Sequence, residues 1–264
     1  MNRPEIEARS RCGRTGATRP VAVWLAGPIG LDASLALAER LAWEVSEPDG
    51  RPPTLVLAEL ERSVTIGRSG SRTDVDLTDE QVRRQGLPVR FVGRGGGAVL
   101  HGPGQVAIWL FARLADLGLG EHDVGAYLER FEHAVEAAVR AVRCGAARDS
   151  GLPGVFGRTG LLAAVGIAVR RGVVWHGGFL NVSPDVRPFE RVRTLPLAGA
   201  SNQRTMGSIE ADVQRPVRLQ DVRAAVVQQV VDAFGFPRAH VHSGLPFPDL
   251  AAPQRRPEIV SRVG

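Results

Sequence analysis

The chain has 264 residues, 44% hydrophobic residues and a net charge of +5, so it can build one large domain or two small ones. All of its positive side chains are arginine, which favours an acidic partner, but no aromatic-plus-basic motif is present and we expect no nucleic acid. Two cysteines, Cys12 and Cys144, exclude a disulfide framework or a metal cluster and fit the cytoplasm. No apolar run is long enough to span a membrane, and the first residues lack an apolar signal segment.

Strands and helices alternate in the first part of the chain. Short apolar runs bounded by glycine and proline predict strands, and apolar residues three and four apart predict helices. In chain order we expect a strand at 21–25, a helix capped by Asp32 that runs to 45, a central strand at 54–58, an extended piece at 64–67, a helix at 78–86 and a strand at 89–92. Thr78 and Gln81 form the capping box of the short helix.

The second part of the chain continues the same alternation. We expect a strand at 105–111, a helix at 124–143, an irregular stretch at 145–157, strands at 161–169, 173–176 and 180–182, a loop at 184–202 with a helical piece near Phe189, and a helix at 219–234. Arg171 and Gly172 should turn the chain back between two of these strands. Gly166, inside an apolar strand, indicates that something approaches the backbone there.

These elements predict a single α/β domain with a mixed β-sheet and flanking helices. We see no internal repeat and no interdomain linker, and we place the domain at residues 20–243. An arginine-rich arm without an apolar period, at 1–19, is expected to be disordered, and a proline- and arginine-rich tail at 244–264 to be loose.

The stretch from Arg94 to Gln105 reads RGGGAVLHGPGQ and is the most informative part of the sequence. Glycine allows a backbone with positive φ or a close approach, and here it accompanies a guanidinium and the imidazole of His101. Such a wall of N–H groups suits a carbonyl, carboxylate or phosphate. A glycine-rich hairpin between two strands is the structural alternative. A dinucleotide fingerprint would need a helix to begin where Gly102, Pro103 and Gly104 follow, and a Walker loop would need a lysine, which the chain lacks.

Several motifs in register resemble the lipoyl(octanoyl) transferase family, within the fold shared by biotin and lipoate protein ligases. The signature loop of that family is similar to Arg94-Gly-Gly together with His101-Gly-Pro-Gly-Gln. Thr65-Ile-Gly-Arg resembles its Thr-Leu-Gly-Arg, and residues 176–182 resemble its His-Gly-x-x-Leu-Asn-Val. The order and spacing agree from about Val21 to Phe234. The resemblance therefore implies the biotin/lipoate protein ligase catalytic-domain fold.

The resemblance also implies an activity. The family moves an octanoyl group from acyl carrier protein to a lysine of lipoyl domains in 2-oxo-acid dehydrogenases or of the glycine cleavage H protein. We expect these partners, a monomer, no cofactor and no metal. The thioester carbonyl would lie against the glycine-rich loop and the acyl chain against small and apolar residues, for which core packing is the structural alternative. The implied substrate-binding residues are Arg94, Gly95, Gly96, Gly97, His101, Gly102, Gly104, Gln105, Ala164, Val165, Gly166, His176, Gly177, Gly178 and Phe179.

The catalytic pair of the family is missing from this sequence. The family uses a cysteine as acyl acceptor and a lysine that lowers the pKa of the thiol. Counting along the motifs places these at Leu195 and Leu161, and we therefore expect no catalytic residue at either position. The nearby Arg158 cannot act as a base at neutral pH. Cys144 should be a buried structural thiol. The hydroxyls that could serve as nucleophiles instead are those of Ser150, Ser201 and Thr194.

Three functions remain open. The first is a catalytically impaired relative that binds acyl groups, acyl carrier protein or lipoyl domains. The second is an active octanoyltransferase in which the substrate lysine attacks directly a thioester polarised by Arg94 and His101. The third is another acyltransferase with a serine nucleophile. The leucines at 161 and 195 favour the first.

Overall fold

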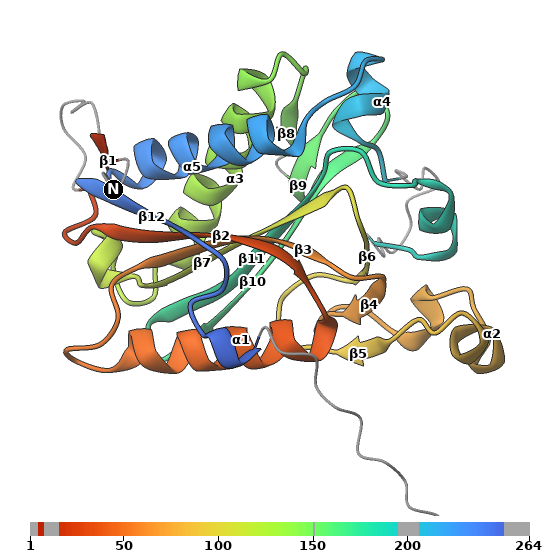
Figure 1. The fold of residues 1–264 in the computed structure, drawn as a ribbon, viewed down its shortest axis with the longest axis horizontal. Coiled ribbons are helices and arrows are strands. Elements are labelled where there is room, and N and C mark those ends of the chain that lie inside the picture. The colour runs from red at the N-terminus through yellow and green to blue at the C-terminus, as the bar shows by residue number, and fades with distance from the viewer. Residues whose placement is uncertain (1–4, 8–15, 150, 195–205, 251–264) are drawn as a thin grey trace, which may run out of the picture.

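The structure, a computed structural model, describes residues 5–7, 16–149, 151–194 and 206–250 (Figure 1). Its strands are β1 (Glu5–Glu7), β2 (Val21–Ile29), β3 (Thr54–Leu60), β4 (Ser63–Ile66), β5 (Val89–Phe91), β6 (Ala98–His101), β7 (Gln105–Arg113), β8 (Ala147–Asp149), β9 (Leu152–Phe156), β10 (Leu161–Arg170), β11 (Val173–Asn181) and β12 (Arg238–Ser243). The helices are α1 (Leu31–Ser46), α2 (Asp79–Arg84), α3 (Val124–Ala141), α4 (Ile209–Val213) and α5 (Leu219–Phe234).

The strands form one large mixed sheet and one small one. The large sheet has the order β1-β12-β2-β3-β7-β11-β10-β9-β8, and the small sheet has the order β5-β4-β6. In the large sheet β12, β2 and β3 are parallel, whereas the pairs from β3 through β7 and β11 to β8 are antiparallel. Arg171 and Gly172, with φ of 52° and 73°, form the turn predicted between β10 and β11. The expected α/β fold with a mixed sheet and flanking helices is confirmed.

Both faces of the large sheet are covered. Helices α3 and α5 pack on one face, and α1 and the small sheet lie against the other (Figure 1). Strand β7 is buried nearly throughout because alternate side chains enter different core clusters, as Ile108 and Trp109 do. A central strand covered on both sides needs such a continuous apolar sequence.

Strands also occur in stretches that were predicted to be irregular. The glycine-rich stretch contains β6, residues 145–157 contain β8 and β9, and residues 173–181 form one strand instead of two. In β9, Gly154 has a φ of 130°, and the pairing of β9 with β10 shifts register between Leu161 and Ala163. Turn-type residues thus sit at an irregularity within a sheet. Neither β12 nor α4 was predicted.

The junction between β2 and α1 also differs from the prediction. Strand β2 continues through Pro28, where its pairing with β3 shifts register, so the missing N–H of proline falls at an irregularity. Helix α1 has Gly30 as its N-cap without a side-chain hydrogen bond, so the predicted cap at Asp32 is wrong. Asp32 lies in the first turn, where its negative charge suits the helix dipole. The predicted capping box of Thr78 and Gln81 is confirmed at the start of α2.

The two ends of the chain pack onto the domain where the structure describes them. Glu5–Glu7 pairs with β12, and the N–H of Ala17 donates to the carbonyl of Phe234 at 2.9 Å. Phe247 is buried, with the guanidinium carbon of Arg40 3.7 Å from its ring centroid. The described parts of the arm at 1–19 and of the tail at 244–264 thus make contacts with the domain.

Candidate functional site

The glycine-rich loop that follows β5 lies directly on β10. The N–H of Gly95 donates to the carbonyl of Ile167 at 2.8 Å. A Cβ atom at Gly166 would collide with the carbonyl oxygen of Gly95, and one at Gly67 would collide with that of Gly96. Glycine at 166 is thus explained by the close approach of another backbone, as its position inside an apolar strand indicated.

Arg94 is buried at the base of this loop with only 3% of its surface exposed. Its Nη1 donates to the carbonyl of Gly95 at 2.9 Å, and its Nη2 donates to the carbonyl and the Oγ1 of Thr65 at 3.0 and 2.8 Å. Its Nε is buried without a hydrogen bond. Burial lowers the pKa of Arg94 to about 10, so the guanidinium stays charged at neutral pH.

His101 lies at the centre of a buried polar network that also contains Arg94, Thr65, Gln105 and Asn181. Its Nε2 is 2.8 Å from Thr65 Oγ1, and its Nδ1 is 3.2 Å from Gln105 Oε1. Gln105 Nε2 donates to Asn181 Oδ1 at 2.8 Å. Because Gln105 Oε1 can only accept, Nδ1 of His101 carries the proton and Nε2 accepts from the Thr65 hydroxyl, which in turn accepts from Arg94.

The electrostatics of His101 agree with this neutral tautomer. Burial and then the positive charge of Arg94 lower the pKa of His101 to about 3, although the hydrogen bond to Gln105 opposes the shift. Both ring nitrogens are occupied and the residue is 1% exposed. In this structure His101 therefore connects β6 to Thr65 of β4 and to Gln105 of β7 through hydrogen bonds.

The far end of the buried polar network reaches the start of β10. Asn181 Nδ2 donates to the carbonyls of Gly207 at 2.9 Å and Leu161 at 3.4 Å. The N–H of Gly207 also donates to the Leu161 carbonyl at 3.0 Å. The network thus connects the glycine-rich loop to Leu161, the position at which the family resemblance implies a lysine. The Leu161 side chain is fully buried among apolar residues.

Gly102 and Gly104 shape the turn from β6 to β7. Gly104 has a φ of 84°, and its carbonyl accepts from the N–H groups of Val182 and Ser183. Its N–H donates to Glu59 Oε2 at 3.3 Å, and Glu59 Oε1 is 3.2 Å from Arg223 Nη2. Gly104 therefore serves the turn itself, although β6 and β7 lie in different sheets and form no hairpin with each other.

A small cavity of about 20 Å³ lies between the glycine-rich loop and β10. Its lining residues are Arg94, Gly96, Gly97, Val99, Pro153, Ala164, Val165, Gly166, Phe179 and Thr194. Most of them were predicted, but Val99 and Pro153 were missed because β6 and β9 were not recognised as strands. Thr194, considered from the sequence only as a nucleophile, has a buried Oγ1 with no hydrogen bond. The cavity presents one cation and one free hydroxyl, which suits a carbonyl or a carboxylate.

Of the predicted residues of the His-Gly segment, Phe179 lines the cavity, whereas His176, Gly177 and Gly178 do not. Cβ atoms at Gly177 and Gly178 would meet the ring of Phe131 at 3.1 and 3.3 Å, so these glycines admit α3 on the opposite face of the sheet. His176 has a φ of 64° and stacks on Trp175 with ring centroids 4.3 Å apart. Burial and then the charges of Arg94 and Arg68 lower the pKa of His176 to about 4.

Of the remaining candidate nucleophiles the structure describes Cys144, which does not line the cavity. Leu195, Cys12, Ser150 and Ser201 lie outside the described residues. Cys144 is buried, as predicted, with its Sγ 3.8 Å from Asp212 Oδ2. Burial and then the Asp212 carboxylate raise the pKa of Cys144 to about 11, which keeps the thiol protonated at neutral pH.

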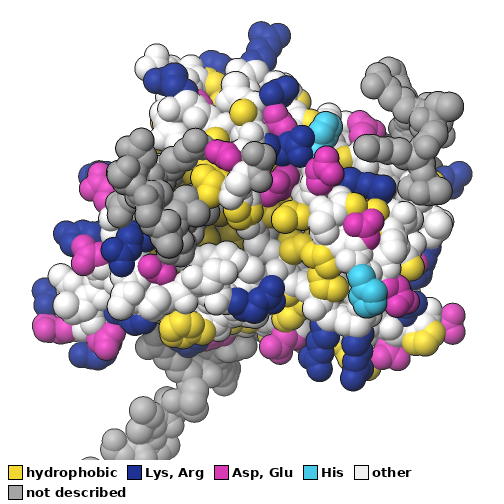
Figure 2. Space-filling model, turned by 180° about the vertical axis from the view of Figure 1, so that it is seen from behind, with side chains coloured by type: hydrophobic (Ala, Val, Ile, Leu, Met, Phe, Trp, Pro, Cys, Tyr) yellow, Lys and Arg dark blue, Asp and Glu magenta, His cyan; other side chains and the backbone are white. Residues whose placement is uncertain are grey.

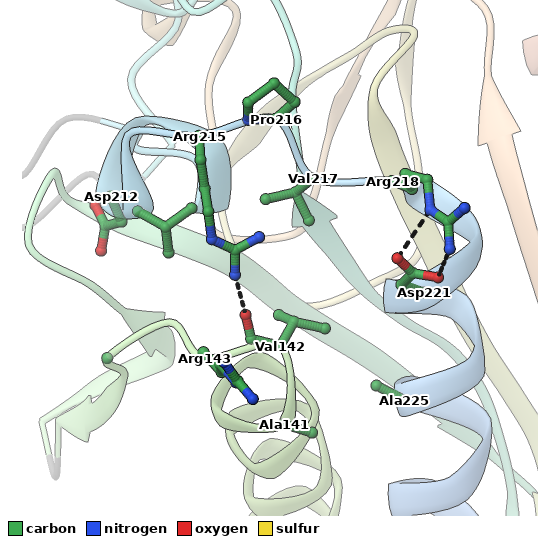
Figure 3. A pocket seen from close by; sticks show the side chains of 12 residues that line it. Ala141, Val142, Arg143, Asp212, Arg215, Pro216, Val217, Arg218, Asp221 and Ala225 are labelled. Atoms are coloured by element: carbon green, nitrogen blue, oxygen red, sulfur yellow. Dashed lines mark hydrogen bonds and ion pairs between the residues drawn. The ribbon is translucent and has the colours of Figure 1, made fainter.

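A larger hollow of about 860 Å³ lies between the end of α3, α4 and the start of α5 (Figure 3). None of the predicted site residues lines it. Arg215 Nη2 donates to the carbonyl of Val142 at 3.0 Å, and Arg218 pairs with Asp221 at 2.9 Å (Figure 3). Because no predicted site residue lines it, the hollow is a weaker candidate than the small cavity.

Charged side chains of both signs are interspersed over the face seen in Figure 2, and apolar side chains gather near its centre. Among the described residues, no group of three His, Cys, Asp or Glu side chains is arranged to hold a metal ion. Within the same residues, no helix combines the length and the apolar composition that a membrane crossing requires.

Comparisons with known proteins converge on one family. The family model described as the lipoyl protein ligase A/B catalytic domain matches residues 32–231. An octanoyltransferase of Geotalea uraniireducens is 36% identical over 200 residues, which cover 76% of this chain and 86% of that protein. An octanoyltransferase of Geobacter metallireducens is 34% identical over 200 residues, covering 76% and 87% of the two chains.

Solved structures show the same fold at low sequence identity. A bipartite lipoate protein ligase from Thermoplasma acidophilum superposes with a TM-score of 0.69 at 18% identity, covering 88% of this chain and 89% of that one. A lipoate-protein ligase A solved with ATP gives a TM-score of 0.66 at 18% identity, covering 87% and 91% of the two chains.

Proposed function

The chain belongs to the lipoyl protein ligase A/B catalytic-domain family, with octanoyltransferases among its relatives, and on that premise we propose that it acts in protein lipoylation as a binding relative whose octanoyl-transfer activity is impaired. In this proposal it binds an acyl group, acyl carrier protein or a lipoyl domain through the site around Arg94. Transfer of octanoyl groups to lipoyl-domain lysines is the reaction to which the octanoyltransferase relatives point.

The side chain of Leu161 is the observation that carries this proposal. It is 0% exposed and packs in an apolar cluster, so it can neither accept a proton nor hold an acyl group. Leu195 stands where the family motifs place the catalytic cysteine. A leucine side chain there likewise can neither accept a proton nor hold an acyl group. Loss of a single nucleophile typically lowers kcat by several orders of magnitude.

Direct transfer without an acyl-enzyme is the first alternative, and the geometry argues against it. Polarising a thioester needs hydrogen-bond donors directed at the carbonyl oxygen. Both ring nitrogens of His101 are bonded to protein groups, and both terminal nitrogens of Arg94 donate to protein oxygens. The Nε of Arg94 is the donor of this pair without a partner.

A hydroxyl nucleophile is the second alternative, and one observation favours it. Thr194 lines the cavity and its Oγ1 has no hydrogen bond. A hydroxyl needs a base, but the pKa values of His101 and His176 are lowered to about 3 and 4 by burial, which makes both imidazoles weak bases.

Intact-mass spectrometry after one incubation tests the proposal. The mixture holds this protein, octanoyl-acyl carrier protein and an unmodified lipoyl domain, and matched mixtures omit this protein. We expect no octanoyl group on this protein and no transfer above background, together with measurable binding of the acyl carrier protein or the lipoyl domain. An octanoylated lipoyl domain would overturn the proposal.

Variants then separate the alternatives. Transfer that survives Cys12→Ala together with Cys144→Ala, but not His101→Ala, would support direct attack. An adduct on a hydroxyl residue that disappears in Thr194→Val would support the hydroxyl mechanism.

A further inference from the structure

Phe179 is the largest apolar side chain on the cavity wall. It is 5% exposed, and its ring centroid lies 4.2 Å from that of His101 and 6.3 Å from that of Trp109. Its cross-strand partner on β10 is Ala164, a small residue. The ring therefore fills the gap between the large sheet and β6.

The remaining space is far too small for a medium-length alkyl chain. A cavity of about 20 Å³ has room for roughly one water molecule. Gly96, Gly97 and Ala164 contribute little side-chain volume to the lining, and the ring of Phe179 is its largest apolar group, so we take this ring as the main limit. Removing a benzene-sized group frees a space on the order of 100 Å³, comparable with engineered cavities that admit benzene.

The ring cannot easily move aside. The imidazole of His101, which lies against it, is held by Thr65 on one side and by Gln105 on the other. Rotation of the phenyl ring away from the cavity requires displacement of His101, which breaks hydrogen bonds of the buried polar network. The obstruction is therefore part of a fixed core and differs from a mobile surface side chain.

We propose that Phe179 is the specificity-determining residue of this site and that its ring excludes acyl chains of medium length. The inference rests on the proposed function, since it takes the cavity beside Arg94 as the acyl site. Octanoyl groups then fit only after the phenyl ring has been removed.

Calorimetric titration with alkanoates tests this inference. Acetate, butanoate and octanoate serve as probes, with the carboxylate standing in for the thioester carbonyl. For the unaltered protein we expect no gain in affinity from butanoate to octanoate. For Phe179→Ala we expect affinity to rise by roughly fourfold per added methylene buried, on the order of 100-fold from four to eight carbons.

Two further variants keep the experiment decisive. Phe179→Leu keeps an apolar core residue in case the alanine variant is poorly folded, and it should show a smaller gain for octanoate. Phe236→Ala removes a fully buried phenyl ring from the core cluster on the opposite face of the sheet. Phe236→Ala should loosen the core about as much as Phe179→Ala does, but it does not enlarge the cavity. The dependence of affinity on chain length should therefore stay as in the unaltered protein.

The outcomes are distinguishable. If the unaltered protein binds octanoate as tightly as Phe179→Ala does, the role of Phe179 is refuted while the proposed acyl site survives. If Phe236→Ala produces the same gain, the effect is general loosening and the role of Phe179 is likewise refuted. If no variant binds any alkanoate, the acyl site itself is refuted, and the inference fails with it.

Discussion

Replacing Asn181 by alanine tests whether the buried polar network holds the site together. Asn181 is fully buried, and its amide joins Gln105 to the carbonyls of Gly207 and Leu161. In Asn181→Ala, the Leu161 carbonyl still accepts a hydrogen bond from the N–H of Gly207. The side chain of Gln105 still donates one to the carbonyl of Leu100. Two good hydrogen bonds are lost at about 1 kcal/mol each, and the unpaired Gly207 carbonyl adds about 1–2 kcal/mol. The free energy of unfolding should fall by about 2–4 kcal/mol.

Urea unfolding followed by circular dichroism gives this free energy, with an unchanged m-value as the sign that both states keep their compactness. Gln228→Ala is the control, because it removes an amide that hydrogen-bonds Asp232 near the surface. It should change the free energy by no more than about 0.5 kcal/mol. If the loss in Asn181→Ala is below about 1 kcal/mol, or equals that of the control, the network does not stabilise the site as argued.

Three further predictions concern titration, close packing and a half-buried ion pair. Because the pKa of His101 is lowered from 6.5 to about 3, the unfolded chain binds more protons in that range and stability falls as pH drops from 6.5 towards 3. The fall should be shallower by about 1.4 kcal/mol per pH unit in His101→Gln, and equal slopes would contradict the shift. Gly166→Ala should lower the unfolding free energy by about 1–3 kcal/mol, whereas Gly93→Ala, whose Cβ meets nothing within 4 Å, should leave it within about 0.5 kcal/mol; similar losses would rule out the close approach. Arg223→Ala should cost about 1–3 kcal/mol in the same assay by leaving the Glu59 carboxylate without its positive partner, and adding Glu59→Gln should restore part of it; no restoration would show that the charge is not the cause.

The predictable part of the fold is the part with a clear apolar period. Strand β7 and helices α3 and α5 were expected because each buries a continuous run or stripe of apolar residues. Strand β6 was hidden because only four residues separate the flanking glycines, and β9 because Pro153 and Gly154 resemble turn residues. These segments become strands because β6 pairs with β4 and β9 pairs with β10. The local pattern of apolar residues does not reveal such pairing between distant segments.

The candidate site was predictable in composition but not in geometry. The motifs identified Arg94, Gly166 and Phe179, which do line the cavity. The sequence could not reveal that His101 is bonded on both sides, because its partner Thr65 lies 36 residues away. The Thr-Ile-Gly-Arg motif contained the signal for Thr65, but without a structure nothing linked that hydroxyl to the imidazole.

The pairing of β2 with β12 has a consequence for how the protein can be made. Val21 at one end of the chain lies opposite Ala239 at the other, and β2 in turn covers the buried Leu55 and Leu57 of β3. A fragment trimmed to the matched region, 32–231, would lack β2 and β12. It would expose the apolar edge of β3, which favours aggregation. During synthesis β2 can pair with β3 early, but the other edge of β2 stays unpaired until β12 has emerged, so that edge is exposed to aggregation in the meantime.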